Sequence, residues 1–167
     1  MTVQIQSITA EDFQTIDGAR RIIVHDHPRQ FARLNLGEPL GCYGLSWCSD
    51  LPLIQPVIQH SHDRQTLWVG VDQRLAAIDL QDGHISLSLA LYYNLFQILP
   101  TRDWVAVLTE LEVLLFDNSD CSLFCSQALP DLAAELSIIN SDLVIRLHDD
   151  RRLNLNLQTA KLVSIGL

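Results

Sequence analysis

The sequence is poor in basic residues and almost free of lysine. Lys161 is its single lysine, and Lys and Arg together number 11 against 20 Asp and Glu in 167 residues, which gives a formal net charge of −9. Nucleic acids and anionic membrane surfaces bind basic protein faces, so this balance argues against both as partners. It permits a basic protein partner, and it is equally typical of a solvated surface that keeps a protein soluble.

Long apolar stretches are also missing. No run approaches the roughly 18 residues of a membrane-spanning helix, because Ser88, Asn94 and Gln97 interrupt the longest candidate, residues 87–99. The first residues hold no basic segment followed by an apolar run, so we expect no signal peptide and a cytoplasmic location. Apolar residues nevertheless make up 48% of the chain, enough for a real core in a single domain.

Signatures of catalysis and phosphate binding are absent. Gly44-Leu45-Ser46-Trp47 lacks the second glycine of a nucleophile elbow, and no glycine-rich loop is followed by a lysine. The chain is therefore expected to have no catalytic residue and no cofactor, and to be a non-enzymatic protein.

Cysteines are few, and their spacing does not form a zinc motif. Cys42 and Cys48 are six positions apart, and Cys121 and Cys125 are four apart. A zinc ribbon needs two closely spaced pairs, which these are not. In a cytoplasmic protein the thiols stay reduced, and Cys121 and Cys125 are best explained as small buried residues of one strand.

What the sequence does contain is strand-like alternation between tight turns. The clearest stretch is residues 67–86, in which two apolar runs flank Asp72-Gln73-Arg74 and the second ends at Asp82-Gly83, a strong hairpin signal. Ile85, Leu87 and Leu89 then alternate with serine and alanine, as in a strand with one buried face.

The same order recurs twice downstream, beginning at Trp104 and at Leu143. Trp68 and Trp104 are 36 residues apart, and Trp104 and Leu143 are 39 apart. With one extended run before each unit, the repeat has about four short strands, near the roughly 40–50 residues of a propeller blade. Because Trp68 and Trp104 are taken as equivalent positions, both are predicted to pack in the core.

The stretch LWVGVDQRLAAIDLQDGHIS, residues 67–86, resembles a blade of the β-propeller repeats of the quinoprotein (PQQ-type) class, in which an ALD…TGK turn joins two strands. LNLQTAKLVS, residues 155–164, is a weaker match, and the resemblance spans about residues 53–166. It implies architecture only, because quinoprotein enzymes close about eight blades around their cofactor and this chain has room for three or four. The predicted fold is all-β, with repeated antiparallel four-stranded units arranged like a partial or small propeller; a β-sandwich is the alternative.

We expect one domain, residues 1–167, in three parts. Residues 1–36 form N-terminal strands or a cap, equivalent at most to a degenerate fourth blade; residues 37–56 form a loop-rich connector; and residues 57–167 form three repeat units. Within the first part, Thr9 can cap a helical turn, residues 13–16 and 19–24 are expected to pair as a hairpin, and residues 31–36 alternate as a strand. Residues 130–135 are the one further helix candidate.

Three histidine clusters invite a metal interpretation: His25-Asp26-His27, His60-Ser61-His62-Asp63 and His148-Asp149-Asp150. Two histidines separated by one residue lie on one face of a strand, a spacing that metal sites use. All three clusters also adjoin predicted turns, where exposed His and Asp are ordinary. No metal ligand is therefore assigned, and a metal-dependent enzyme or sensor using His60 and His62, with His25 and His27, remains an alternative.

The favoured functional hypothesis is a protein-interaction module, with a basic protein as a candidate partner and a homo-oligomer as a further option. It rests on the missing site signatures, the acidic balance and a repeat scaffold of a kind that presents binding loops. A small-ligand module built on the aromatic loop around Trp47 is the third alternative.

Overall fold

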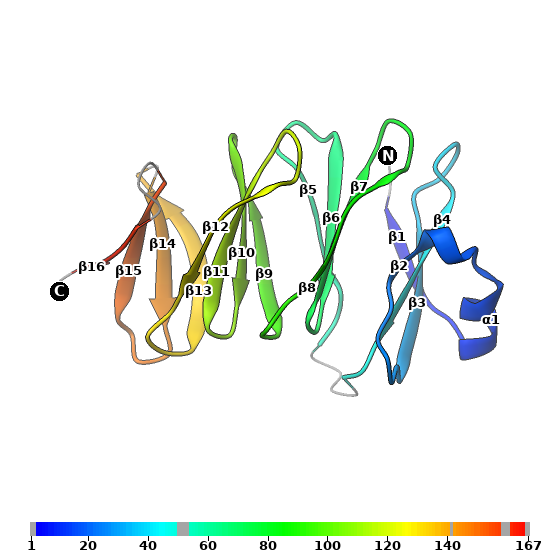
Figure 1. Cartoon of the computed structure of the whole chain (residues 1–167), viewed down its shortest axis with the longest axis horizontal. Helices are drawn as coiled ribbons and strands as arrows, with labels where there is room; N and C mark the ends of the chain where they lie inside the picture. Colours follow the sequence, from blue (N-terminus) through cyan, green and yellow to red (C-terminus); the bar gives the residue numbers. More distant parts are fainter. Residues whose placement is uncertain (1–2, 50–53, 141, 158–160, 166–167) are drawn as a thin grey trace.

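The computed structural model describes residues 3–49, 54–140, 142–157 and 161–165. Its strands form four four-stranded sheets, here called sheets one to four, which stand side by side in chain order (Figure 1). Sheet one contains β1 (Gln4–Ser7), β2 (Arg21–Ile23), β3 (Gln30–Asn35) and β4 (Cys42–Trp47); sheet two contains β5 (Val57–His60), β6 (Thr66–Val71), β7 (Arg74–Asp79) and β8 (Ile85–Ala90). Sheet three contains β9 (Leu95–Pro100), β10 (Trp104–Thr109), β11 (Glu112–Asp117) and β12 (Leu123–Ala128); sheet four contains β13 (Ala133–Ile139), β14 (Asp142–Leu147), β15 (Arg152–Asn156) and β16 (Lys161–Ile165). The predicted all-β class is confirmed.

Between β1 and β2 the chain forms the helix α1 (Ala10–Thr15) and a 3-10 turn (Gly18–Arg20). Thr9 caps α1 as predicted: its hydroxyl accepts from the Asp12 amide at 3.1 Å, and the Asp12 side chain accepts in return from the Thr9 amide. The predicted hairpin of residues 13–16 and 19–24 is wrong, because this capping box starts a helix that includes Phe13.

Sheet one has the strand order β1-β3-β4-β2, with β2 and β4 parallel. The N-terminal strands therefore do form a fourth sheet. Its third strand in that order, β4, comes from the region predicted to be a loop-rich connector, so that part of the prediction is wrong. Glycines at positions 41 and 44 suggested a loop, but Gly44 lies in the strand where a Cβ atom would be 2.8 Å from the Phe13 ring. The assignment of the whole chain to one domain stays a prediction.

Sheets two, three and four are antiparallel meanders built on a repeat of 38 residues. Their first strands begin at Val57, Leu95 and Ala133, each 38 residues after the previous one, and their second strands begin at residues 66, 104 and 142, again 38 apart. The strand register agrees, because Thr66 opposes Asp79 in sheet two and Trp104 opposes Asp117 in sheet three. The repeat is therefore tighter than the Trp-to-Trp spacing indicates.

The core lies between the faces of neighbouring sheets. Side chains alternate along each strand, so Leu67 and Val69 of β6 pack towards sheet one while Trp68 packs towards sheet three. Trp68 is fully buried, and its ring lies 5.2 Å from that of Phe116. Leu143 and Ile145 of sheet four pack in turn on sheet three. Apolar burial between sheets is thus what holds the row together.

The helix predicted for residues 130–135 is wrong. Ala133 and Glu135 belong to β13, which pairs with β14 from Ala133 opposite Leu147 to Ile139 opposite Asp142. Good helix formers yield to strand pairing here, since Ala133 and Leu136 bury their side chains against sheet three.

The turn that ends the third strand recurs in sheets two and three. The Gly83 amide donates to the Asp79 carbonyl in one, and the Cys121 amide donates to the Asp117 carbonyl in the other. Gly83 has φ +78° and Cys121 has φ +58°, so a cysteine occupies the left-handed position that glycine fills one repeat earlier.

Cys121 is expected to react slowly with thiol reagents in the folded protein. Burial raises the pKa of its thiol to about 11, so at pH 8 about one molecule in a thousand carries the reactive thiolate. Modification mapped by mass spectrometry at pH 8 should label Cys121 at least about tenfold faster in the urea-unfolded chain than in the folded one. Because only the folded chain holds this thiol protonated, the free energy of unfolding should fall as the pH rises from about 9 to about 11. Equal labelling rates in both states would contradict the assignment.

Candidate functional site

Trp104 is the exposed aromatic side chain around which the candidate site is built. It opens β10 and is half-buried, unlike Trp68, because the 38-residue repeat makes it equivalent to Thr66, while Ala106 is equivalent to Trp68. The predicted equivalence of the two tryptophans is therefore wrong. The Trp104 ring lies 4.4 Å from that of Phe124 at the start of β12, and the Phe124 side chain is 47% exposed.

A hollow of about 320 Å³ lies on one side of Trp104, between sheets three and four. Ile138, Leu143 and Leu157 give it an apolar wall, and Thr101, Arg102 and Asp103 line its rim. Ile138 is 48% exposed although it belongs to β13. We call this the apolar hollow; an exposed aromatic ring beside aliphatic side chains is suited to hold an apolar side chain of another molecule.

A second hollow of about 340 Å³, here called the polar hollow, shares Arg102, Asp103 and Trp104 with the first. It is completed by side chains from the loops of sheets two and three: Asp63, Asp117, Asn118 and Ser119. The Asn118 side-chain amide donates to the Arg102 carbonyl at 3.3 Å, which joins the two loops of sheet three. Trp104 thus stands between an apolar and a polar hollow, and we refer to the pair as the Trp104 site.

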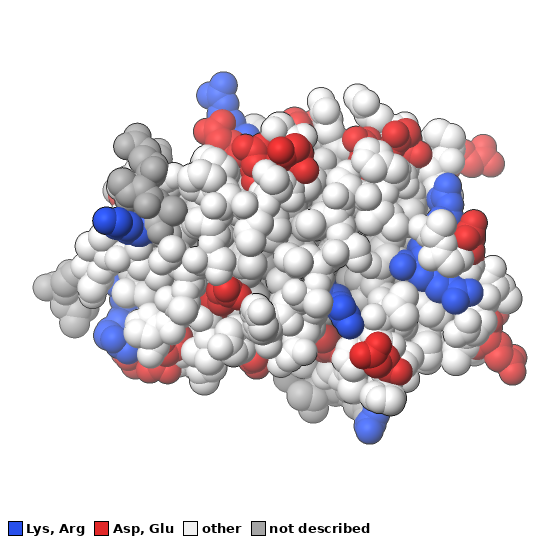
Figure 2. Space-filling view, viewed as in Figure 1, with Lys and Arg blue, Asp and Glu red and all other residues white. Residues whose placement is uncertain are grey.

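The carboxylates around the polar hollow are held in their ionised form. The Ser61 hydroxyl donates to Asp63 at 2.6 Å and lowers the pKa of that carboxyl group. The hydroxyl and amide of Ser119 donate to Asp117 and likewise lower its pKa. Figure 2 shows Asp and Glu side chains gathered along the edge of the molecule that carries these loops. The Trp104 site therefore has a negatively charged rim at neutral pH.

The structure does not bring the predicted histidines together as a metal centre. His25 is half-buried, and its Nδ1 accepts from the His27 amide at 3.1 Å, while His62 is exposed. His60 lines a hollow of about 700 Å³ with Gln59, Ser61, Arg64 and Leu80. Burial, reinforced by Arg64, lowers the pKa of His60. His148 is exposed in the turn after β14.

Among the described residues, one group of three potential metal ligands is close together, namely Asp79, Asp82 and His84. Their atoms already serve the turn: Asp79 accepts from the Gln81 amide, and Asp82 accepts from both the amide and the ring Nδ1 of His84. The equivalent turn of sheet three makes the same amide bonds with Ser122 in place of His84. The arrangement is therefore explained by turn formation, which needs no metal.

Trp47 and the cysteines near it do not form the aromatic binding loop considered as an alternative. Trp47 and Tyr43 lie in β4 and are buried in the core between sheets one and two, with exposed fractions of 4% and 0%. Cys48 is half-buried and lines a hollow of about 240 Å³ with His25 and Asp72. The aromatic side chains available to a partner at a hollow are instead Trp104 and Phe124.

Comparison with known proteins identifies the architecture. No family model and no curated protein matches the chain. Among solved structures, BamB from Moraxella catarrhalis is 15% identical over 98% of this chain and 51% of its own, with a TM-score of 0.56. NirN in complex with DHE is 14% identical over 87% of this chain and 34% of its own, with a TM-score of 0.56. HIRA(644-1017) is 10% identical over 97% of this chain and 48% of its own, with a TM-score of 0.55.

All three are β-propellers, and BamB is of the PQQ-like type. The chain has a propeller-like fold. The predicted resemblance to quinoprotein repeats is confirmed at the level of architecture, and the four sheets are blade-like units rather than the halves of a sandwich. The chain spans about half or less of the length of these structures, and at such identities the likeness shows the fold alone.

The described part of the chain contains no helix with the length and apolar character needed to cross a membrane.

Proposed function

We propose that the chain is a non-enzymatic protein-interaction module of the cytoplasm, and that the Trp104 site binds its partner. The propeller-like fold supports the general class, since it presents loops from consecutive blades along one edge. The Trp104 site supports the location, because it combines an exposed aromatic pair, an apolar hollow and an acidic rim. Aromatic anchors in such pockets carry much of the energy of protein interfaces.

The chemistry of the site defines the partner. The apolar hollow fits one aliphatic or aromatic side chain, held against Trp104 and Ile138. Asp63, Asp103 and Asp117 line the adjoining polar hollow, so a basic residue next to that side chain would be paired. We therefore propose a protein segment in which an apolar residue is followed by Lys or Arg; the acidic balance disfavours nucleic acid as the ligand.

The single observation that carries this proposal is the position of Trp104 between the two hollows, so Trp104 is the residue to change. The chain is used as bait in a soluble extract at low and at high salt, and proteins retained in stoichiometric amounts are identified by mass spectrometry. Trp104→Ala should weaken the retained interaction at least about tenfold, the effect of losing an interface anchor. High salt should weaken it as well, because rim charges are screened.

Tyr92→Ala is the matched control. Tyr92 is an aromatic residue with 87% of its surface exposed, and it lies in the link between β8 and β9 rather than at the Trp104 site. Thermal unfolding of both variants establishes that each is folded. A partner that is kept by Trp104→Ala and lost by Tyr92→Ala would overturn the location, and the absence of any stoichiometric partner would overturn the proposed class.

A further inference from the structure

The faces that the sheets turn towards their successors follow a rule in sheets two and three. Towards sheet three, sheet two presents Trp68, Leu75 and Ala77 beside Gly70, where an added Cβ would lie 2.5 Å from Leu95. Towards sheet four, sheet three presents four buried apolar side chains: Ala106, Leu108, Val113 and Leu115. Each of these faces is apolar because the next sheet covers it.

The equivalent face of sheet four is polar. Leu143, Ile145 and Leu147 pack on sheet three, so the alternating residue Arg146 points away from it. Arg146 lies 38 residues after Leu108, and its register partner is Arg152, as Val113 is that of Leu108. Asn154 likewise takes the place of Leu115, opposite Val144. Two arginines and an asparagine thus replace three buried apolar residues.

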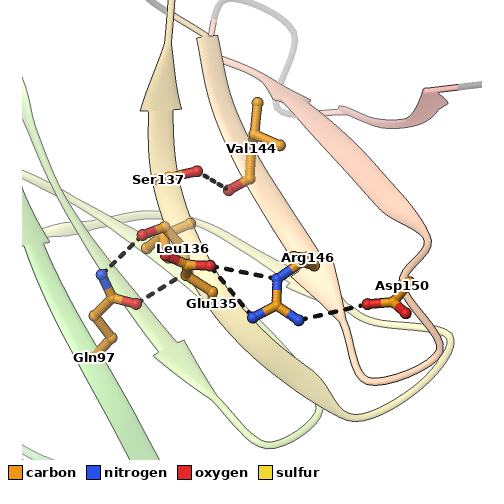
Figure 3. A network of polar contacts seen from close by, with 7 residues as sticks. All are labelled: Gln97, Glu135, Leu136, Ser137, Val144, Arg146 and Asp150. Atoms are coloured by element: carbon orange, nitrogen blue, oxygen red, sulfur yellow. Dashed lines mark hydrogen bonds and ion pairs between the residues drawn. The ribbon is translucent and has the colours of Figure 1, made fainter.

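A second repeat position changes in the same sense. In β9, the Gln97 side chain donates to the Leu136 carbonyl at 2.8 Å and accepts from the Leu136 amide at 3.0 Å, which ties sheet three to sheet four. The residue 38 positions later is Glu135, and its carboxylate accepts from Arg146 at 3.3 Å within sheet four. Asp150 lies 3.7 Å from the same guanidinium group (Figure 3). The position that reaches the next sheet in β9 is therefore engaged inside sheet four.

The opposite end of the row is covered by a different element. Gly44 of sheet one alternates with Tyr43 and Leu45, which face sheet two, and a Cβ atom at Gly44 would meet the Phe13 ring at 2.8 Å and Ile16 at 3.2 Å. The helix α1, which contains Phe13, therefore lies on the outer face of sheet one. Figure 1 shows α1 beyond sheet one and sheet four at the other end of the row.

We propose that the row of sheets is capped at both ends, by α1 on sheet one and by the polar face of sheet four, so that two copies of the chain do not join face to face into a larger propeller. Burying Arg146, Arg152 and Glu135 under a second copy would remove charged groups from water, and they would lack partners on the outer face of α1's sheet. Repeat arrays in general end in units with such polar outer faces.

The test restores the apolar rule on sheet four. A variant carrying Arg146→Leu, Arg152→Val and Asn154→Leu takes the residues of sheet three at the equivalent positions. Sedimentation velocity over a hundredfold range of concentration should show the wild-type chain as a monomer throughout. The variant should shift to a concentration-dependent dimer or larger species.

A control variant separates this effect from general stickiness. Ser86→Leu with Ser88→Val places new apolar side chains on exposed positions of β8, and it should sediment as the wild-type chain does. Circular dichroism establishes that each variant is folded; should the triple variant fail to fold, Arg146→Leu alone replaces it. The proposal is overturned by a wild-type dimer that Arg146→Glu dissociates, or by a folded restored-face variant that stays monomeric at all concentrations.

Discussion

Replacing Asp72 by alanine is expected to lower the free energy of unfolding by about 3 kcal/mol. The Asp72 side chain is 94% buried, since its exposed fraction is 6%, and one carboxylate oxygen accepts from the amides of Cys48 and Ser49 at 2.8 and 3.0 Å. Its backbone carbonyl accepts from the Leu95 amide at 2.7 Å. One residue of the β6–β7 turn thus connects the end of sheet one with the start of sheet three.

The alanine variant loses both side-chain bonds and leaves two amides without their acceptor. It also keeps a residue with a Cβ at φ +48°, where Asn and Asp are tolerated better than Ala. Asp72→Asn is the matched variant, because its side-chain oxygen can still accept one amide and it suits this backbone; we expect it to cost about 1 kcal/mol. Urea unfolding measures both, and equal stability of the alanine variant and the wild-type chain would contradict the connecting role.

Replacing Gly83 by alanine is the second substitution with a large expected effect, about 2–4 kcal/mol. Gly83 has φ +78°, and a Cβ atom there would lie 2.5 Å from the Tyr43 hydroxyl oxygen. That hydroxyl donates to the Gly83 carbonyl at 2.6 Å, so the turn of sheet two is held against sheet one. An added methyl group would push Tyr43 away and break this bond.

Gly37→Ala is the control that isolates the contact from the backbone effect. Gly37 has the same φ of +78°, and nothing lies within 4 Å of an added Cβ. We expect Gly37→Ala to cost about 1 kcal/mol, the penalty of the left-handed conformation alone. Thermal and urea unfolding of both variants should show the larger loss for Gly83→Ala, and equal losses would show that the contact with Tyr43 contributes nothing.

Much of the fold could be predicted from local sequence patterns. Alternation gave the strands of sheets two and three, Asp82-Gly83 gave a turn, and Thr9 gave the start of a helix, because each depends on near neighbours in the chain. Two expectations failed where distant partners decide the outcome. Residues 133–135 are helix formers drawn into β13 by pairing with β14, and β4 contains Gly44 because α1 packs on it.

The candidate site was missed because the repeat was aligned on its tryptophans. That alignment placed Trp104 with Trp68 in the core, and only the strand register shows that it matches Thr66. A spacing of 38 residues, applied to the sequence, also places Phe124 at the position of Ser86, which predicts an exposed aromatic pair. The hollows beside Trp104 depend on loops from three sheets, so their shape does not follow from any local pattern.

The most direct test of the proposed function is hydrogen exchange of the chain, free and bound to its captured partner. We predict slower exchange in residues 101–104 and 117–124 on binding, since these segments line the two hollows and carry Phe124. Residues 91–94, which link β8 to β9 and include the control residue Tyr92, should exchange at an unchanged rate. Protection of residues 91–94 with no change at 101–104 and 117–124 would contradict the account.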